Sequence, residues 1–248
     1  MLELKNLSFS VSEENSKEKE IVKDVSLTIG DGKLVVITGP NGGGKSTLAK
    51  LIMGIEKPTS GKIFFNGEDI TDLSVTERAK KGISFAFQQP VKFKGLKVLD
   101  LLRIASGKNL SVGDACTYLS SVGLCARDYI DRELNASLSG GELKRIEIAQ
   151  VLSRATKLSI FDEPEAGIDL WSFNNLIKVF EGMRRDINDG SIIIISHQER
   201  ILNIADEIVV INGGTVERKG AKEQIMPTLL GSSTLVNFCT GAAKEENV

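Results

Sequence analysis

A glycine-rich stretch in the first fifth of the chain has the residue types and spacing of a phosphate-binding loop. It reads Gly39-Pro40-Asn41-Gly42-Gly43-Gly44-Lys45-Ser46-Thr47. Glycines let the backbone fold so tightly that successive N–H groups face the β- and γ-phosphates of a nucleotide. Lys45 would add a positive charge, and the hydroxyl of Ser46 would bind Mg²⁺. The stretch therefore predicts a site for a nucleoside triphosphate.

A second anion-binding pattern stands about a hundred residues further on, in Leu138-Ser139-Gly140-Gly141-Glu142. A serine and two glycines here precede a long polar helix, and the N–H groups at the start of a helix bind anions. Because the first loop already accounts for one phosphate site, we interpret the second pattern as half of a different site.

Polar residues also follow three expected strands. Asp162 and Glu163 come directly after Leu158–Phe161, and His197, the only histidine, comes after Ile192–Ser196. Gln88 follows the strand Ser84–Phe87. The carboxyl ends of parallel strands are where ligands bind in α/β sheets, so these residues are candidate parts of the same nucleotide site.

Taken in this order, the motifs resemble those of the ATP-binding cassette (ABC) ATPases, and the resemblance covers nearly the whole chain. It implies that the chain is an ATPase with ATP and Mg²⁺ as its cofactors. It further implies that two cassettes face each other head to tail. The second motif of one cassette would close over the ATP held by the first motif of its partner.

The resemblance also implies residue roles. Asp162 would hold Mg²⁺ through its water shell, and Glu163 would act as the general base that polarises the attacking water. His197 would be the switch histidine at the γ-phosphate. Gln88 would touch Mg²⁺ and link the core to a helical subdomain, with Gln89 as the competing choice. The full set comprises Gly39, Pro40, Asn41, Gly42, Gly43, Gly44, Lys45, Ser46, Thr47, Ser139, Gly140 and Gly141 for the nucleotide, Ser46, Gln88 and Asp162 for the metal, and Glu163, His197 and Gln88 for catalysis.

Two further positions bear on the resemblance. Asp169 stands where the family has its dimer-contacting loop. Transporters of the family usually stack adenine on an aromatic residue late in the first strand, but Val11 occupies that place and Phe9 lies two residues earlier. We interpret Phe9 as core packing. Loss of a stacking contact worth about 0.5 to 1.5 kcal/mol would weaken base discrimination without abolishing binding through the triphosphate.

Several short segments are similar to SufC, the cytosolic branch of the family that serves iron–sulfur cluster assembly. They are Leu7–Ser12, Ala86–Val91, Lys144–Gln150 and His197–Leu202. This likeness implies a soluble partner, a scaffold protein of the SufB/SufD type. The segments Asp162-Glu163-Pro164 and Ala166-Gly167-Ile168-Asp169 depart from the SufC pattern. The alternative is therefore the ATP-binding subunit of a transporter, docked on a membrane permease.

Composition excludes other classes. The net charge of −2 and the absence of a basic stripe give no reason to expect binding to nucleic acid. No apolar run approaches the roughly 20 residues of a membrane span. Cys116, Cys125 and Cys239 are scattered, which favours neither disulfides nor a metal cluster and fits a reducing compartment, the cytoplasm.

The elements that would position these motifs follow from hydrophobic patterns. Expected strands are 2–11, 25–29, 34–38, 62–66, 82–87, 158–161, 192–195 and 208–211, and expected helices are 98–104, 112–122, 171–185, 199–204 and one starting near Lys45. The pattern predicts an α/β fold, a P-loop NTPase core with a mixed or parallel sheet, an antiparallel β edge and an inserted helical subdomain. We expect one domain over 1–248, with 1–89 and 153–248 as catalytic core and 90–152 as the helical subdomain that carries the second motif.

Overall fold

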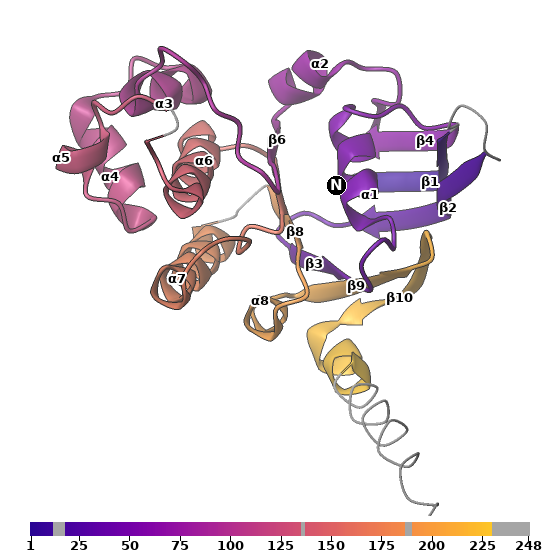
Figure 1. Cartoon of the computed structure of the whole chain (residues 1–248). Helices are drawn as coiled ribbons and strands as arrows, with labels where there is room; N and C mark the ends of the chain where they lie inside the picture. The colour runs from indigo at the N-terminus through magenta and orange to yellow at the C-terminus, as the bar shows by residue number, and fades with distance from the viewer. Residues whose placement is uncertain (12–17, 135–136, 187–189, 230–248) are drawn as a thin grey trace, which may run out of the picture.

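The computed structural model describes residues 1–11, 18–134, 137–186 and 190–229 (Figure 1). Most of the segment between the first two strands, together with Cys239 and the tail from Lys244, lies outside these ranges. Within them, none of the helices is both long and apolar enough to cross a lipid bilayer.

The centre of the fold is a six-stranded sheet in the order β10-β9-β3-β8-β7-β6, in which every neighbouring pair except β9 and β10 is parallel. Every residue of β3, β7 and β8 is buried. Successive side chains of a strand face opposite sides, so Val35 and Ile37 join one hydrophobic cluster, and Leu34 and Val36 join the other. Burial on both faces explains why these strands read as continuous apolar runs. The strands are β3 (Leu34–Thr38), β6 (Ile83–Ala86), β7 (Leu158–Asp162), β8 (Ser191–Ile195), β9 (Glu207–Asn212) and β10 (Thr215–Ala221).

The antiparallel strands that we expected at an edge form a second, four-stranded sheet in the order β2-β1-β4-β5. With α1 (Lys45–Met53), it packs on one face of the central sheet. β2 starts at Lys19, earlier than the expected Val25, because its first residues pair with the end of β1 while their side chains stay exposed. The strands are β1 (Leu2–Val11), β2 (Lys19–Ile29), β4 (Ser60–Phe65) and β5 (Glu68–Asp69).

Helices cover the other face of the central sheet, and α3 to α6 stand together to one side of it (Figure 1). In the described part of 90–152 we find helices and one isolated bridge between Lys97 and Glu133, but no strand. The boundaries of an inserted subdomain there stay a prediction. The helices on this other face are α3 (Val98–Ser106), α4 (Val112–Ser121), α5 (Ala126–Tyr129), α6 (Gly140–Arg154), α7 (Leu170–Asp186) and α8 (Glu199–Asn203). The short helix α2 (Val75–Lys80) instead packs beside the end of α1, on the face that carries the antiparallel sheet.

The sequence analysis missed α2, α5, β5 and β10, which are short and mostly polar. Helix α2 nevertheless carries a readable start signal, because Ser74 and Glu77 form a reciprocal capping box. Its Arg78 is only 1% exposed. The guanidinium donates to the carbonyls of Leu51 and Ile52 at the end of α1, at 2.7 and 2.8 Å, and also to the carbonyls of Thr71 and Leu73. Arg78 therefore supplies hydrogen-bond donors to carbonyl groups in the last turn of α1, the helix that follows the glycine-rich loop.

We predict that Arg78→Ala lowers the free energy of unfolding by about 3 kcal/mol or more, because it leaves several buried carbonyls without a donor. Urea denaturation followed by circular dichroism measures this change. Arg127→Ala is the matched control, since Arg127 is exposed, and should change stability by less than about 0.5 kcal/mol. A loss below about 1 kcal/mol for Arg78→Ala would contradict the assigned role.

Candidate active site

The glycine-rich loop joins β3 to α1 and is packed tightly against neighbouring backbone. Gly39 has a φ of 136°, and a Cβ atom there would stand 1.9 Å from the carbonyl oxygen of Ile211 in β9. Gly44 has a φ of 96°, and a Cβ atom there would stand 2.8 Å from the carbonyl oxygen of Ile21 in β2. Both positions require glycine, for space as well as for backbone conformation.

The start of α1 is left open to an anion in the described structure. Gly44 is its N-cap residue, no side chain accepts a hydrogen bond there, and no acidic residue stands in the first turn. By contrast, α2, α4 and α6 each begin with a serine cap and an acidic residue in the first turn. Because the N–H groups and the helix dipole favour negative charge, α1 can receive a phosphate group at the place where α2, α4 and α6 use their own side chains.

Lys45 lies inside the loop, only 6% exposed. Its ammonium donates to the carbonyl oxygens of Gly39 and Pro40, both at 2.9 Å. Burial lowers the pKa of Lys45, while the carboxylates of Glu163 and Asp162 oppose that shift. The loop therefore holds a cation next to the open helix start.

Ser46 and Asp162 meet across the site. The hydroxyl of Ser46 donates to Oδ1 of Asp162 at 2.9 Å, and Asp162 is 3% exposed. Burial raises the pKa of Asp162, and the Ser46 hydrogen bond opposes that shift. Mg²⁺ prefers oxygen ligands and is often bound by one or two carboxylates plus phosphates and water. The pair fits such a site, and the described residues contain no cluster of three or more His, Cys, Asp or Glu side chains that would suggest a metal held by protein alone.

Gln88 and Glu163 are in direct contact. The amide of Gln88 donates to Oε2 of Glu163 at 2.6 Å. Glu163 has a φ of 43°, a left-handed conformation that is uncommon for residues other than glycine, and its N–H donates to the carbonyl oxygen of Ile195 at 3.0 Å. Such backbone strain is characteristic of functional sites.

A cavity of about 240 Å³ gathers several of these side chains. Both Gln88 and the competing Gln89 line it, but the hydrogen bond to Glu163 is made by Gln88. The lining residues are Ser46, Lys50, Phe85, Phe87, Gln88, Gln89 and Asp162. The structure thus brings together all three residues predicted to bind the metal.

His197 is exposed and follows directly on β8. The residue before it, Ser196, is fully buried. Its N–H donates to the carbonyl oxygen of Ile37 in β3 at 3.1 Å, and its hydroxyl donates to Glu165. These bonds fix the point from which His197 leaves the sheet beside the glycine-rich loop. Burial raises the pKa of Glu165, which the sequence analysis did not single out.

The second motif forms the start of α6. Ser139 is the N-cap, and its side chain accepts from the N–H of Glu142 at 3.2 Å while its own N–H donates to Oε2 of Glu142 at 2.6 Å. Glu142 also accepts from the hydroxyl of Tyr129, and these bonds hold the pKa of Glu142 at about 2. Gly140 is exposed, and a Cβ atom on Gly141 would lie 3.3 Å from the carbonyl oxygen of Gly167. Neither these glycines nor Ser139 is among the residues described as lining the cavity with Ser46 and Asp162.

Asp169 lies just beyond the Gly167 turn. Its Oδ1 accepts the N–H groups of Trp171 and Ser172, both at 3.0 Å, which lowers the pKa of Asp169 and starts α7. Phe9 packs against the hydrophobic core as expected, whereas Val11 is exposed.

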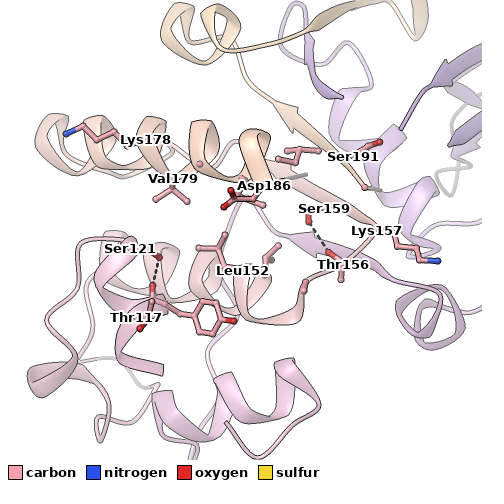
Figure 2. A pocket seen from close by; sticks show the side chains of 17 residues that line it. Thr117, Ser121, Leu152, Thr156, Lys157, Ser159, Lys178, Val179, Asp186 and Ser191 are labelled. Carbon is pink, nitrogen blue, oxygen red and sulfur yellow. Dashed lines mark hydrogen bonds between the residues drawn. The ribbon is translucent and has the colours of Figure 1, made fainter. Parts of the chain in front are cut away.

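A larger cavity of about 710 Å³ lies elsewhere, between α4, α6 and α7 (Figure 2). Thr156 and Lys157, which precede β7, and Ser191, the first residue of β8, line it. It therefore opens at the amino ends of the parallel strands. Ligands of α/β sheets bind at the carboxyl ends, where the smaller cavity and the glycine-rich loop lie.

Two buried charges near the site were also missed, Lys144 and Glu147 of α6. Their ammonium and carboxylate groups contact the backbone of Phe87, next to Gln88. The sequence shows a charged pair at helical spacing, but this spacing is equally typical of a solvated helix surface.

Comparisons with known proteins agree with this geometry. The family model described as ABC transporter matches residues 22–166. An uncharacterised ABC transporter ATP-binding protein of Methanocaldococcus jannaschii is 39% identical over 215 residues, which cover 84% of this chain and 85% of the relative. The "Probable ATP-dependent transporter ycf16" of Cyanophora paradoxa is 35% identical over 239 residues, covering 90% and 89%.

Solved structures show the same fold. A dimeric post-hydrolysis ATP-binding cassette bound to ADP and Pi superposes with a TM-score of 0.80 at 24% identity, covering 90% of this chain and 99% of that one. A nucleotide-free cassette from an ABC transporter gives 0.76 at 26% identity, covering 93% and 94%. The chain belongs to the ABC transporter family of ATP-binding cassettes, and its enzymatic activity is the hydrolysis of ATP.

Proposed function

We propose that this chain works as a pair of cassettes arranged head to tail, with each ATP bound between the glycine-rich loop of one copy and Ser139, Gly140 and Gly141 of the other. The observation that carries the proposal is that the two glycine-containing motifs stand at the starts of different helices, and that Ser139, Gly140 and Gly141 do not line the cavity with Ser46 and Asp162. The start of α1 lies open beside Lys45, whereas the start of α6 lies on the surface beside Gly167. A solved cassette of the same fold is dimeric with ADP and Pi bound, which supports pairing of two cassettes.

Within each site, the N–H groups of residues 39–47 and the Lys45 ammonium bind the β- and γ-phosphates. Ser46, Gln88 and Asp162 would hold Mg²⁺, which when bound neutralises the charge of the phosphates. The Glu163 carboxylate accepts a proton from the water that attacks the γ-phosphorus. His197 donates a hydrogen bond to a γ-phosphate oxygen. The products are ADP and inorganic phosphate, and the loss of the γ-phosphate contacts lets the pair open.

The names of the relatives favour the ATP-binding subunit of a transporter, because they are called transporter proteins. In this proposal a separate membrane permease docks on the cassette. An apolar groove beside Gln88 suits such a partner: Phe85, Phe87 and Pro90 line it, and Val91 and Phe93 in it are 48% and 38% exposed. A permease segment bound in this groove would contact Phe87, the residue before Gln88, and could thereby shift the Gln88 amide that donates to Glu163.

Specific residues favour a second candidate, a SufC-like ATPase that acts on a soluble SufB/SufD-type scaffold during iron–sulfur cluster assembly in the cytoplasm. Gln88 and Gln89 are followed by Pro90 and Val91, and Gln150 replaces the arginine more usual in transporters. Both Pro90 and Gln150 line the apolar groove. Two of the four SufC-like segments, Ala86–Val91 and Lys144–Gln150, therefore contribute to this groove, and in this candidate function the scaffold would bind there.

Glu163→Gln should bind ATP but hydrolyse it roughly 10² to 10⁴ times more slowly, because the glutamine amide cannot accept the proton. The variant should then accumulate as a closed dimer with ATP. Phosphate release and size-exclusion chromatography measure the two effects. Trp171 is the only tryptophan and is 81% exposed next to Asp169, so its emission should also shift to shorter wavelength on closure.

Normal hydrolysis by Glu163→Gln would show that another group is the base. A variant that binds ATP yet stays monomeric at all protein concentrations would exclude the head-to-tail pair. Glu165→Gln is not a suitable control, since the Glu165 carboxylate accepts the hydroxyl of Ser196, the residue before His197. Glu181→Gln, an exposed change on α7, should behave like the parent chain.

Gly39→Ala should abolish detectable ATP binding, because its Cβ atom cannot be placed without moving β9. Gly42→Ala is the matched variant in the same loop: its φ of 75° is also left-handed, but its Cβ atom would meet nothing within 4 Å. Gly42→Ala should therefore cost only about 1 to 2 kcal/mol of conformational free energy, and the variant should keep a measurable affinity for ATP. Equilibrium binding of a fluorescent ATP analogue compares the two, and equal affinities would contradict the loop geometry.

Affinity purification of the tagged chain from its native cells separates the two candidate functions. Recovery of a permease that requires detergent supports the transporter subunit. Recovery of a soluble partner carrying iron and sulfide supports the assembly function instead. Val91→Asp should reduce recovery of either partner, because it places a charge in the apolar groove while leaving the loop and Glu163 intact.

A further inference from the structure

Lys144 is a lysine with no exposed surface. It lies in the second turn of α6, and its ammonium donates to the carbonyl oxygens of Phe87, Gln88 and Asp162, the last two at 3.3 and 3.4 Å. The ammonium thus binds the backbone of two segments that the site needs, the one leading into Gln88 and the end of β7. Each segment carries a residue proposed to bind Mg²⁺.

Glu147 lies one turn further along the same helix and completes the contact. Its Oε1 accepts the N–H of Phe87 at 2.8 Å, and its Oε2 lies 3.7 Å from the Lys144 ammonium. Phe87 is therefore held by α6 at both its N–H and its carbonyl oxygen. Its backbone cannot shift relative to the helix without breaking a buried charge-assisted hydrogen bond.

Simple stabilisation does not account for this pair. Removing two charges from water costs several kcal/mol per ion, and well-packed apolar residues often replace buried ion pairs without loss of stability. Burial lowers the pKa of Lys144 and raises the pKa of Glu147, so the surroundings disfavour the charged form of each side chain. If the pair transmits the movement of α6 to the backbone of Phe87 and Gln88, this function explains the free-energy cost of burying the two charges better than a contribution to folding does.

The start of the same helix is the second phosphate-binding motif. Lys144 stands five residues after Ser139, a rise of about 7.5 Å at 1.5 Å per residue. One rigid turn and a half of helix therefore joins Ser139 to the ammonium that holds the backbone of Phe87 and Gln88. Any displacement of the helix start is passed to that backbone.

We propose that Lys144 and Glu147 are positioning residues that couple the two ATP sites of the proposed pair. When Ser139 and Gly140 of one copy close on the ATP held by its partner, α6 moves and carries Phe87 and Gln88 of its own site with it. The Gln88 amide then sets the position of the Glu163 carboxylate. This inference rests on the proposed head-to-tail pair.

The test uses Lys144→Met, which keeps the length of the side chain and removes the ammonium. The affinity for MgATP should change by less than about threefold, because the loop N–H groups and Lys45 are untouched. The kcat should fall about ten- to a hundredfold, which is the usual effect of removing a residue that orients a metal ligand. Lys178→Met on exposed α7 controls for loss of a lysine and should leave both quantities unchanged.

Hydrogen exchange of the backbone near Gln88 measures the coupling in the Glu163→Gln variant, which should hold ATP long enough for the closed pair to accumulate. MgATP should slow exchange of the backbone N–H groups of residues 86–89 and 91 at least about tenfold, as the closed pair forms. Ser139→Arg in the same background obstructs closure on the partner's ATP and should remove this slowing. Lys144→Met should also remove it, although the closed dimer still forms by size-exclusion chromatography.

Should Lys144→Met fail to fold, Lys144→Met with Glu147→Leu replaces the pair by apolar residues and restores stability. This double variant should melt near the parent temperature yet keep the low kcat and the fast exchange. A kcat within about twofold of the parent, or retained slowing by MgATP, overturns the coupling inference. Failure of Glu163→Gln to dimerise is a different result, which overturns the pair itself.

Discussion

Parallel pairing of β3, β8 and β7 is the constraint on which the rest of the site depends. Ile195 pairs with Ile37 on one side and with Asp162 on the other, so the three strands end at one edge. The glycine-rich loop, the Asp162–Glu163 pair and His197 leave the sheet at that edge, although more than a hundred residues separate the first from the others. Burial of both faces fixes this register, because a slip by one residue would exchange the two hydrophobic clusters.

The starts of α1 and α6, both proposed to contact ATP, differ in how their backbone N–H groups are satisfied. Helix α1 begins on a glycine with no side-chain cap, so its N–H groups depend on a ligand. Helix α6 begins with a closed capping box between Ser139 and Glu142, which Tyr129 reinforces. The first start is therefore open to a ligand, whereas the second is already closed by its own side chains. This difference suits a fixed surface that closes on a ligand held by another copy.

Several charged groups around the site have pKa values shifted by burial. Lys45, Asp162, Lys144 and Glu165 are each shifted in pKa mainly by burial, and each is anchored to backbone or to a hydroxyl group. None is arranged as a simple surface ion pair. Since these groups are largely removed from water, a displacement of α6 relative to the backbone that Lys144 and Glu147 hold carries an electrostatic cost, and this makes the connection rigid.

The sequence by itself determined the α/β fold, the nucleotide loop and the family, because these depend on local patterns: apolar runs for buried strands, glycines for the loop, and polar residues placed directly after strands. It also predicted that Gln88 and Asp162 lie at the same edge of the sheet, because each stands where a parallel strand ends. The tertiary structure alone decided the separate antiparallel sheet, the choice of Gln88 over Gln89 as partner of Glu163, and the burial of Arg78 and Lys144. A charged residue on a helix has the same local sequence whether it faces water or a ring of carbonyls, and only packing between distant elements selects between the two.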